Sequence, residues 1–146
     1  MRDYYPYPTR DPIKNYFPLP NEIFLLDLSA GELAVYSYLM RCEDRRTHQC
    51  HPAYKTIGEA VNLSPATVAK HVNGLREKHL ITTEKTEITT RQGEKRNGTL
   101  RYTIRPVEEA LRYFYERQME EMEDAQARQK IQRKLAELDR RQGRIG

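Results

Sequence analysis

The sequence has few cysteines, no long apolar run and no apolar leader, and each absence excludes a class of protein. Its two cysteines, Cys42 and Cys50, are too few for a disulfide framework in a chain of 146 residues, which favours a reducing compartment. No segment approaches the roughly 18 apolar residues of a membrane span. The N-terminus lacks the apolar core of a signal peptide. These features predict a cytoplasmic protein without a membrane partner.

Catalytic patterns are also missing. The sequence offers no Ser-His-Asp or Cys-His arrangement, no phosphate-cradling glycine loop ahead of a helix, and no carboxylate pair that stands out among its glutamates. We therefore expect neither an enzyme nor a cofactor.

The positive charge is concentrated in the middle of the chain. Residues 1–44 carry 4 basic and 7 acidic side chains (net −3), residues 45–105 carry 12 and 5 (net +7), and residues 106–146 carry 9 of each. Local concentration of cations attracts phosphates more effectively than a high overall charge does. Residues 45–105 are therefore where we expect a nucleic acid to bind.

The most informative pattern runs from Thr56 to Thr82. It begins with an amphipathic helix that ends at Asn62, because asparagine tolerates the left-handed backbone conformation. Ser64 then caps a second helix, and Pro65 suits its first turn. A helix, a three-residue turn and a second capped helix are the parts of a helix-turn-helix, which predicts DNA binding.

The second of these helices has an apolar stripe and a polar outer face. Val68, Val72 and Leu75 recur at i, i+4 and i+7, which predicts the buried side. The outer face carries groups that can bind base edges, phosphates or a thymine methyl group. These candidates are Ala66, Thr67, Lys70, His71 and Asn73. The alternative is a face that is merely solvated, as on most surface helices.

A basic pair of strands should follow. Residues 80–90 are rich in Thr and Ile, and residues 99–105 alternate between apolar and polar, so both predict strands. Residues 91–98 contain two glycines and an Asn-Gly pair, which predicts a loop or hairpin tip. Its cations suit DNA backbone or minor-groove contact, although basic tips also serve solubility. They are Lys85, Arg91, Lys95, Arg96, Arg101 and Arg105.

The segments on either side leave alternatives open. Residues 1–20 are rich in Tyr and Pro and predict an extended arm, which either enters a groove or is loosely ordered. Ser29 and Glu32 predict a capping box that opens a helix. Residues 107 to about 141 predict one long helix. Its interrupted heptads leave both a homodimer through this C-terminal helix and a solvated tail open.

Four potential metal ligands, Cys42, His48, Cys50 and His51, lie within ten residues of one another. Their spacing fits no zinc finger or ribbon pattern, so we expect no metal, and a metal-responsive switch remains an alternative.

The order of capped helix, short strand, helix, turn, Ser-capped helix and basic wing resembles the winged helix-turn-helix family. Tyr54–Val61, Leu63–Val68 and Leu75–Ile81 look like bacterial regulators of that class. Leu19–Phe24, Leu28–Glu32, Cys42–Arg45 and the wing strands are similar to winged-helix proteins of Gram-positive plasmids and mobile elements, often labelled replication initiator protein A. The resemblance covers about residues 17–106.

The resemblance implies that the second helix of the motif enters the major groove while the wing touches the DNA backbone. On this sequence the groove residues are Ser64, Pro65, Ala66, Thr67, Lys70 and His71, and the wing residues are Arg91, Lys95 and Arg96. Two positions depart from the family. His79 replaces the usual glycine, which implies a positive φ. Gly74 lies inside the second helix, which implies close packing or a bend there.

Together these observations predict an α+β winged helix-turn-helix, with a three-helix core and a two- or three-stranded wing sheet, followed by a long C-terminal helix. The expected divisions are an arm (1–20), the domain (21–106) and the C-terminal helix (107–146). The predicted function is sequence-specific binding of double-stranded DNA, as a transcription regulator or a replication initiator of a bacterial mobile element. A winged-helix protein–protein interaction module is the alternative without DNA.

Overall fold

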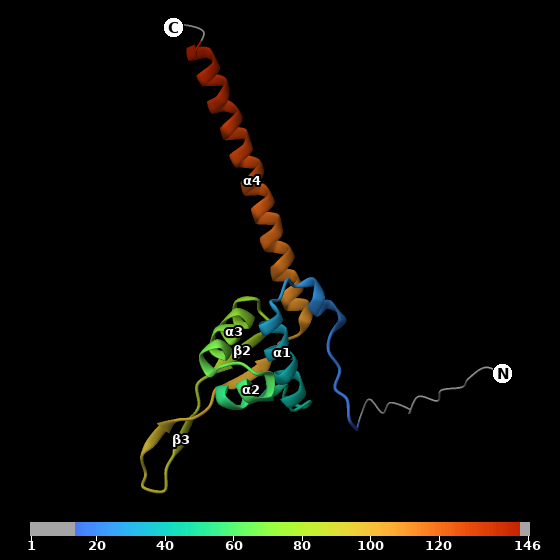
Figure 1. The fold of residues 1–146 in the computed structure, drawn as a ribbon, viewed down its shortest axis with the longest axis vertical. Helices are drawn as coiled ribbons and strands as arrows, with labels where there is room; N and C mark the ends of the chain where they lie inside the picture. Colours follow the sequence, from blue (N-terminus) through green and yellow to red (C-terminus); the bar gives the residue numbers. More distant parts are fainter. Residues whose placement is uncertain (1–13, 144–146) are drawn as a thin grey trace, which may run out of the picture.

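The computed structural model describes residues 14–143, so most of the predicted arm lies outside the described residues. Three helices form a compact body, and a hairpin and a long helix project from it in opposite directions (Figure 1). In chain order the elements are η1 (Asn21–Leu25), α1 (Ala30–Cys42), β1 (Gln49–Cys50), α2 (Tyr54–Val61), α3 (Pro65–Glu77), β2 (Ile81–Glu84), β3 (Glu87–Thr89), β4 (Lys95–Asn97), β5 (Arg101–Ile104) and α4 (Val107–Gly143).

The first helix of the body begins at the predicted capping box. The Ser29 backbone N–H donates to Glu32 Oε1 at 3.0 Å, and the Glu32 N–H donates to Ser29 Oγ at 3.1 Å. Helix α1 packs on α2 and α3 around a common apolar core. The largest fully buried side chains include Tyr36, Leu39, Ile57, Val68, Val72, Leu75, Leu80 and Tyr102.

A three-stranded antiparallel sheet closes one side of this core, in the order β1-β5-β2. Ile81 pairs with Ile104, and Cys50 pairs with Tyr102. Because neighbouring residues of a strand point to opposite faces, Tyr102 and Ile104 are both buried, as the alternation along residues 99–105 predicts.

The segment 80–90 is not one strand, and this prediction was wrong. The chain leaves the sheet after Glu84 and forms a second, separate two-stranded sheet of β3 and β4. The Gly98 N–H donates to the Thr86 carbonyl at 2.7 Å, and a Cβ on Gly98 would lie 2.5 Å from Thr86 Oγ1. Glycine therefore permits the close approach at the base of the hairpin.

The predicted use of the Asn-Gly pair also needs correction. Asn97 lies in β4 and Gly98 follows it, so the pair stands at the base of the hairpin and not at its tip. The tip is a turn in which the Thr90 N–H donates to the Glu94 carbonyl at 2.8 Å. Gly93 has φ +84 there, a conformation that glycine adopts without strain.

Helix α4 starts on the body and then leaves it. Val107, Leu111 and Phe114 pack against the core, as predicted. Beyond them lie two exposed apolar triads, Tyr115, Met119, Met122 and Ile131, Leu135, Leu138. Each member of the second triad follows its counterpart by 16 positions. At about 100° per residue the two triads lie about 160° apart around the helix, so they form no continuous stripe.

No helix within residues 14–143 is both long enough and apolar enough to cross a membrane.

Candidate nucleic-acid interface

The turn between α2 and α3 sets the start of the candidate interface. Asn62 adopts the left-handed conformation with φ 58, and the Leu63 N–H donates to the Gly58 carbonyl at 3.0 Å. A Cβ on Gly58 would overlap the Leu63 carbonyl oxygen, well inside the 3.0 Å below which Cβ atoms are essentially never seen. Only glycine therefore allows the turn to close this tightly.

Helix α3 begins at a side-chain cap that the sequence predicts. Ser64 is the N-cap, its Oγ accepts from the Thr67 N–H at 3.2 Å, and Pro65 occupies the first turn. The Thr67 hydroxyl lies 2.8 Å from the Ser64 hydroxyl. Both polar groups are thus already used in holding the helix start, and Thr67 is only half exposed.

The outward face of α3 forms one row at helical spacing. Its members are exposed, whereas Val68, Val72 and Leu75 on the opposite side are buried. We call the row the α3 outer row; it consists of Ala66, Lys70, Asn73 and Glu77. Ser64 and Pro65 are exposed beside its first member. The row offers an apolar methyl group, a cation and an amide, which are groups that can contact thymine, guanine and adenine, respectively.

His71 lies differently from the other predicted contacts. It is half-buried, and its ring stands where a Cβ on Gly31 of α1 would have to go. The ring therefore faces α1, beside the row and not within it.

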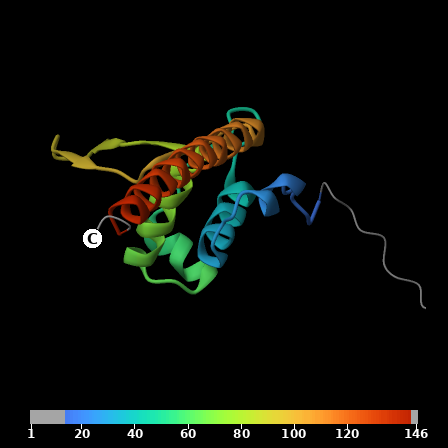
Figure 2. The same ribbon diagram turned by 90° about the horizontal axis from the view of Figure 1, so that it is seen from above.

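The hairpin of β3 and β4 carries the second set of predicted contacts. Arg91, Lys95 and Arg96 are all exposed. Arg96 makes one loose ion pair with Glu94, with 3.7 Å between Nη2 and Oε2. Both views place this hairpin and α3 on the same side of the body, away from the N-terminal segment (Figures 1 and 2).

A groove between α3 and the sheet adds a residue that sequence reasoning missed. Arg76 is exposed on the flank of the outer row, and its Nη1 lies 3.5 Å from Asn73 Oδ1. It lines the groove together with Thr82 and Thr83 of β2 and with Arg105. The spacing of three residues from Asn73 was the available signal, because residues three apart are neighbours on a helix surface.

Comparison with known proteins identifies the segment that contains α3. Residues 26–81 match the family model of a helix-turn-helix domain, the stretch that contains α1, α2 and α3. The sheet and hairpin that follow supply the wing. The domain is a winged helix-turn-helix. In helix-turn-helix proteins that bind DNA, the second helix of the motif lies in the major groove.

Two solved structures resemble this winged helix-turn-helix protein at low identity. A possible transcriptional regulator from Methanosarcina mazei Go1 is 17% identical with a TM-score of 0.41, and the match covers 68% of this chain and 80% of that one. A MarR-family transcriptional regulator from Silicibacter pomeroyi is 20% identical with a TM-score of 0.39, covering 73% of this chain and 60% of that one. No curated protein sequence matches the chain.

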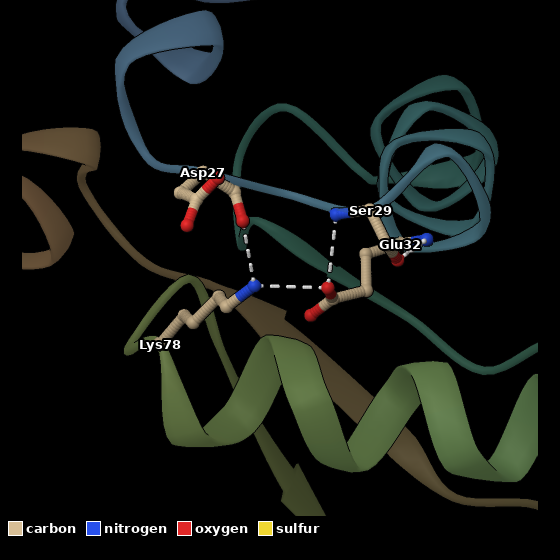
Figure 3. A network of polar contacts seen from close by, with 4 residues as sticks. All are labelled: Asp27, Ser29, Glu32 and Lys78. Carbon is tan, nitrogen blue, oxygen red and sulfur yellow. Dashed lines mark hydrogen bonds and ion pairs between the residues drawn. The ribbon is translucent and has the colours of Figure 1, made fainter.

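Behind the interface, a polar network ties α3 to α1 (Figure 3). Lys78, directly after α3, donates to Glu32 Oε1 at 2.9 Å and to the Asp27 carbonyl at 3.0 Å. Burial alone would raise the pKa of Glu32. Hydrogen bonds from Lys78 and Ser29, with the charge of Lys78, outweigh burial and hold that pKa below its ordinary value of 4.5.

The residue that follows Lys78, His79, joins the winged helix-turn-helix to α4 by an aromatic contact. His79 has φ 64, which confirms the positive φ that the resemblance implies. Its ring stacks on Tyr113 of α4 with 3.8 Å between centroids, and Arg117 lies over the same tyrosine ring. This stacking offsets part of the strain that a positive φ costs histidine.

The four potential metal ligands do not form a site. Burial, and then the charges of Cys42 and Glu43, raise the pKa of the Cys50 thiol to about 12, which disfavours the thiolate that metals bind. Its Sγ donates to the Leu39 carbonyl at 3.7 Å. Across residues 14–143, no three His, Cys, Asp or Glu side chains are placed to hold a metal ion.

Proposed function

We propose that the protein is a regulator that binds double-stranded DNA in a sequence-specific manner, with α3 in the major groove and the wing on the DNA backbone. One observation carries the proposal: the α3 outer row presents Ala66, Lys70 and Asn73 to solvent beside a hairpin of exposed cations. The net charge of +7 over residues 45–105 supports it, because phosphates are attracted to concentrated positive charge.

Base contacts are assigned to the outer row, and Arg76 adds a cation at its flank. Ser64, Pro65 and Thr67 sit at the start of α3, the part of a recognition helix that contacts base edges in helix-turn-helix proteins. Arg91, Lys95 and Arg96 are assigned to phosphates. Phosphate contacts fix the position of the protein, whereas base contacts specify the sequence.

Selection of bound fragments from a random duplex library, followed by titration of a selected duplex and a scrambled one, tests this assignment. Lys70→Ala combined with Asn73→Ala should weaken binding to the selected duplex by about 10-fold or more and leave the thermal midpoint unchanged. The matched control is Gln126→Ala with Lys130→Ala, which removes an amide and a cation from exposed sites on α4. Equal losses of affinity for both duplexes would show that Lys70 and Asn73 do not read bases.

Salt dependence separates DNA binding from the protein-interaction alternative. A protein that contacts phosphates loses affinity steeply as salt rises, because counterions are released on binding. Weak duplex binding that salt does not affect would favour a winged helix that binds another protein.

The finer proposal is a role on a bacterial mobile element, as a transcription regulator or a replication initiator. Its support is the sequence resemblance of Leu19–Phe24, Leu28–Glu32 and Cys42–Arg45 to plasmid proteins. Finding the selected sequences at a replication origin would favour initiation, and finding them at promoters would favour regulation.

We also propose that two copies pair through α4. Tyr115, Met119 and Met122 support this, because they are exposed at i, i+4 and i+7 just beyond the body. Sedimentation of the full chain and of a chain ending at Glu116 tests it. The full chain should be a dimer and the shortened chain a monomer; an unchanged dimer would show that α4 beyond Glu116 is not the interface.

A further inference from the structure

Helices α1 and α3 approach each other at two glycines, one on each helix. A Cβ on Gly31 of α1 would collide with the ring of His71, which belongs to α3. A Cβ on Gly74 of α3 would lie 2.5 Å from Glu32 Oε2, which belongs to α1. Each helix therefore offers a notch at a glycine, and a side chain of the other helix fills it. We call these the Gly31 notch and the Gly74 notch.

We propose that His71 is a positioning residue, not a base-reading one, and that its ring in the Gly31 notch aims the α3 outer row at DNA. The inference rests on the proposed function, because aiming matters only if α3 reads DNA. It assigns to His71 a role different from the major-groove contact that the sequence predicts.

The placement of His71 on α3 supports this role. At about 100° per residue, His71 points about 100° away from Lys70 and about 160° away from Asn73. It shares its side of the helix with Gly74 and Lys78, at i+3 and i+7, and both of those face α1. His71 is half-buried, whereas Lys70 and Asn73 are exposed. One ring cannot fill the notch and reach a base at once.

The two notches add to the apolar packing of Val68, Val72 and Leu75 in positioning α3. A single notch contact would let this side of the helix rotate about that point, whereas two contacts on adjacent turns restrict both its rotation and its position along the axis. Lys78 keeps Glu32 in the Gly74 notch through the contact of 2.9 Å between Nζ and Oε1. Helix surfaces pack in a few discrete arrangements, so moving α3 would require both side chains to leave.

A double-mutant cycle on thermal stability tests whether the ring occupies the notch. Gly31→Ala in the wild type places a methyl group where the ring lies, so it should lower the thermal midpoint by about 2–6 °C. In a His71→Ala background the space is empty, and Ala is a better helix former than Gly, so the same change should raise the midpoint. An equal effect in both backgrounds would show that the His71 ring does not occupy the Gly31 notch.

Binding to single-base-pair variants of a selected duplex tests the positioning role. His71→Ala should weaken the selected duplex by about 10-fold and reduce discrimination at several base pairs together, because the whole outer row is displaced. His71→Gln, which still reaches the notch, should retain more of the discrimination. Loss confined to one base pair would make His71 a base reader and overturn the proposal.

The two measurements distinguish failure of the proposed function from failure of the positioning role. If the cycle shows coupling but the protein binds no duplex selectively, the proposed function fails and the positioning role fails with it. If the protein reads DNA but the cycle shows no coupling, the proposed function stands and only the positioning role is overturned.

Discussion

Lys78 Nζ lies 2.9 Å from Glu32 Oε1, and this ion pair joins the end of α3 to the first turn of α1. The Glu32 side chain is 10% exposed and the Lys78 side chain 34%, so water screens the pair less than it screens pairs on the surface. Of the contacts drawn in Figure 3, this pair is the one that joins the two helices through side chains on both sides.

We predict that Lys78→Ala lowers the free energy of unfolding by about 1–2 kcal/mol, because it removes a charged hydrogen bond from a carboxylate that stays largely covered. Urea denaturation measures the change. Arg141→Ala is the control, since it breaks the exposed pair with Glu137 and should cost under about 0.5 kcal/mol. Equal losses of stability would show that the Glu32–Lys78 pair behaves as a surface pair.

The pH dependence of stability should report on Glu32. Its pKa is lowered in the folded protein from 4.5, so the unfolded state binds the proton at a higher pH. The wild type should therefore exceed Glu32→Gln in stability above pH 4.5, and this advantage should shrink as the pH falls through the folded pKa. Glu116→Gln, at an exposed site on α4, should show no such trend. An advantage that grows on acidification would contradict the network.

Removal of the wing cations should change how DNA binding responds to salt. We expect the triple variant Arg91→Ala, Lys95→Ala, Arg96→Ala to weaken binding to any duplex and to reduce the slope of log K against log salt by about 1 for each phosphate that is no longer bound. The control replaces Arg128, Lys130 and Arg133 of α4, which are equally exposed. A wild-type slope in the wing variant would mean that the wing stays off the DNA.

Gly58→Ala should destabilise the protein although alanine is the better helix former. Propensity alone would stabilise α2 by up to about 1 kcal/mol. Overlap of the new Cβ with the Leu63 carbonyl oxygen should outweigh this and cost about 1–3 kcal/mol in thermal or urea unfolding. Glu59→Ala, next to it and exposed, should stay near zero. A stabilised Gly58→Ala would mean that the turn can open.

Much of the fold follows from local chemistry, and the sequence therefore predicts it well. The capping box at Ser29, the end of α2 at Asn62 and the Ser64-Pro65 start of α3 each depend on neighbouring backbone groups. The apolar periodicity of Val68, Val72 and Leu75 likewise decides which side of α3 is buried.

Errors arose where distant segments meet. Residues 80–90 have strand propensity throughout, yet the strand breaks at Lys85 and Thr86, because Thr86 bonds across to Gly98 and to the Thr99 carbonyl at the base of the hairpin. The Asn-Gly pair has the composition of a hairpin tip, but it lies at the base of the hairpin. Propensity cannot distinguish the two places, since both call for a residue with little steric hindrance.

The sequence by itself therefore determined the helix-turn-helix, the buried stripe of α3 and the cations of the wing. Each of these features depends on residues that are neighbours along the chain or along one helix. Only the tertiary structure decided what the polar residues of α3 contact. Helical spacing already separates His71 from Lys70, but it does not show that the His71 ring lies against α1, where the missing side chain of Gly31, 40 positions earlier, leaves room for it. That contact depends on how two helices pack, and no local pattern records it.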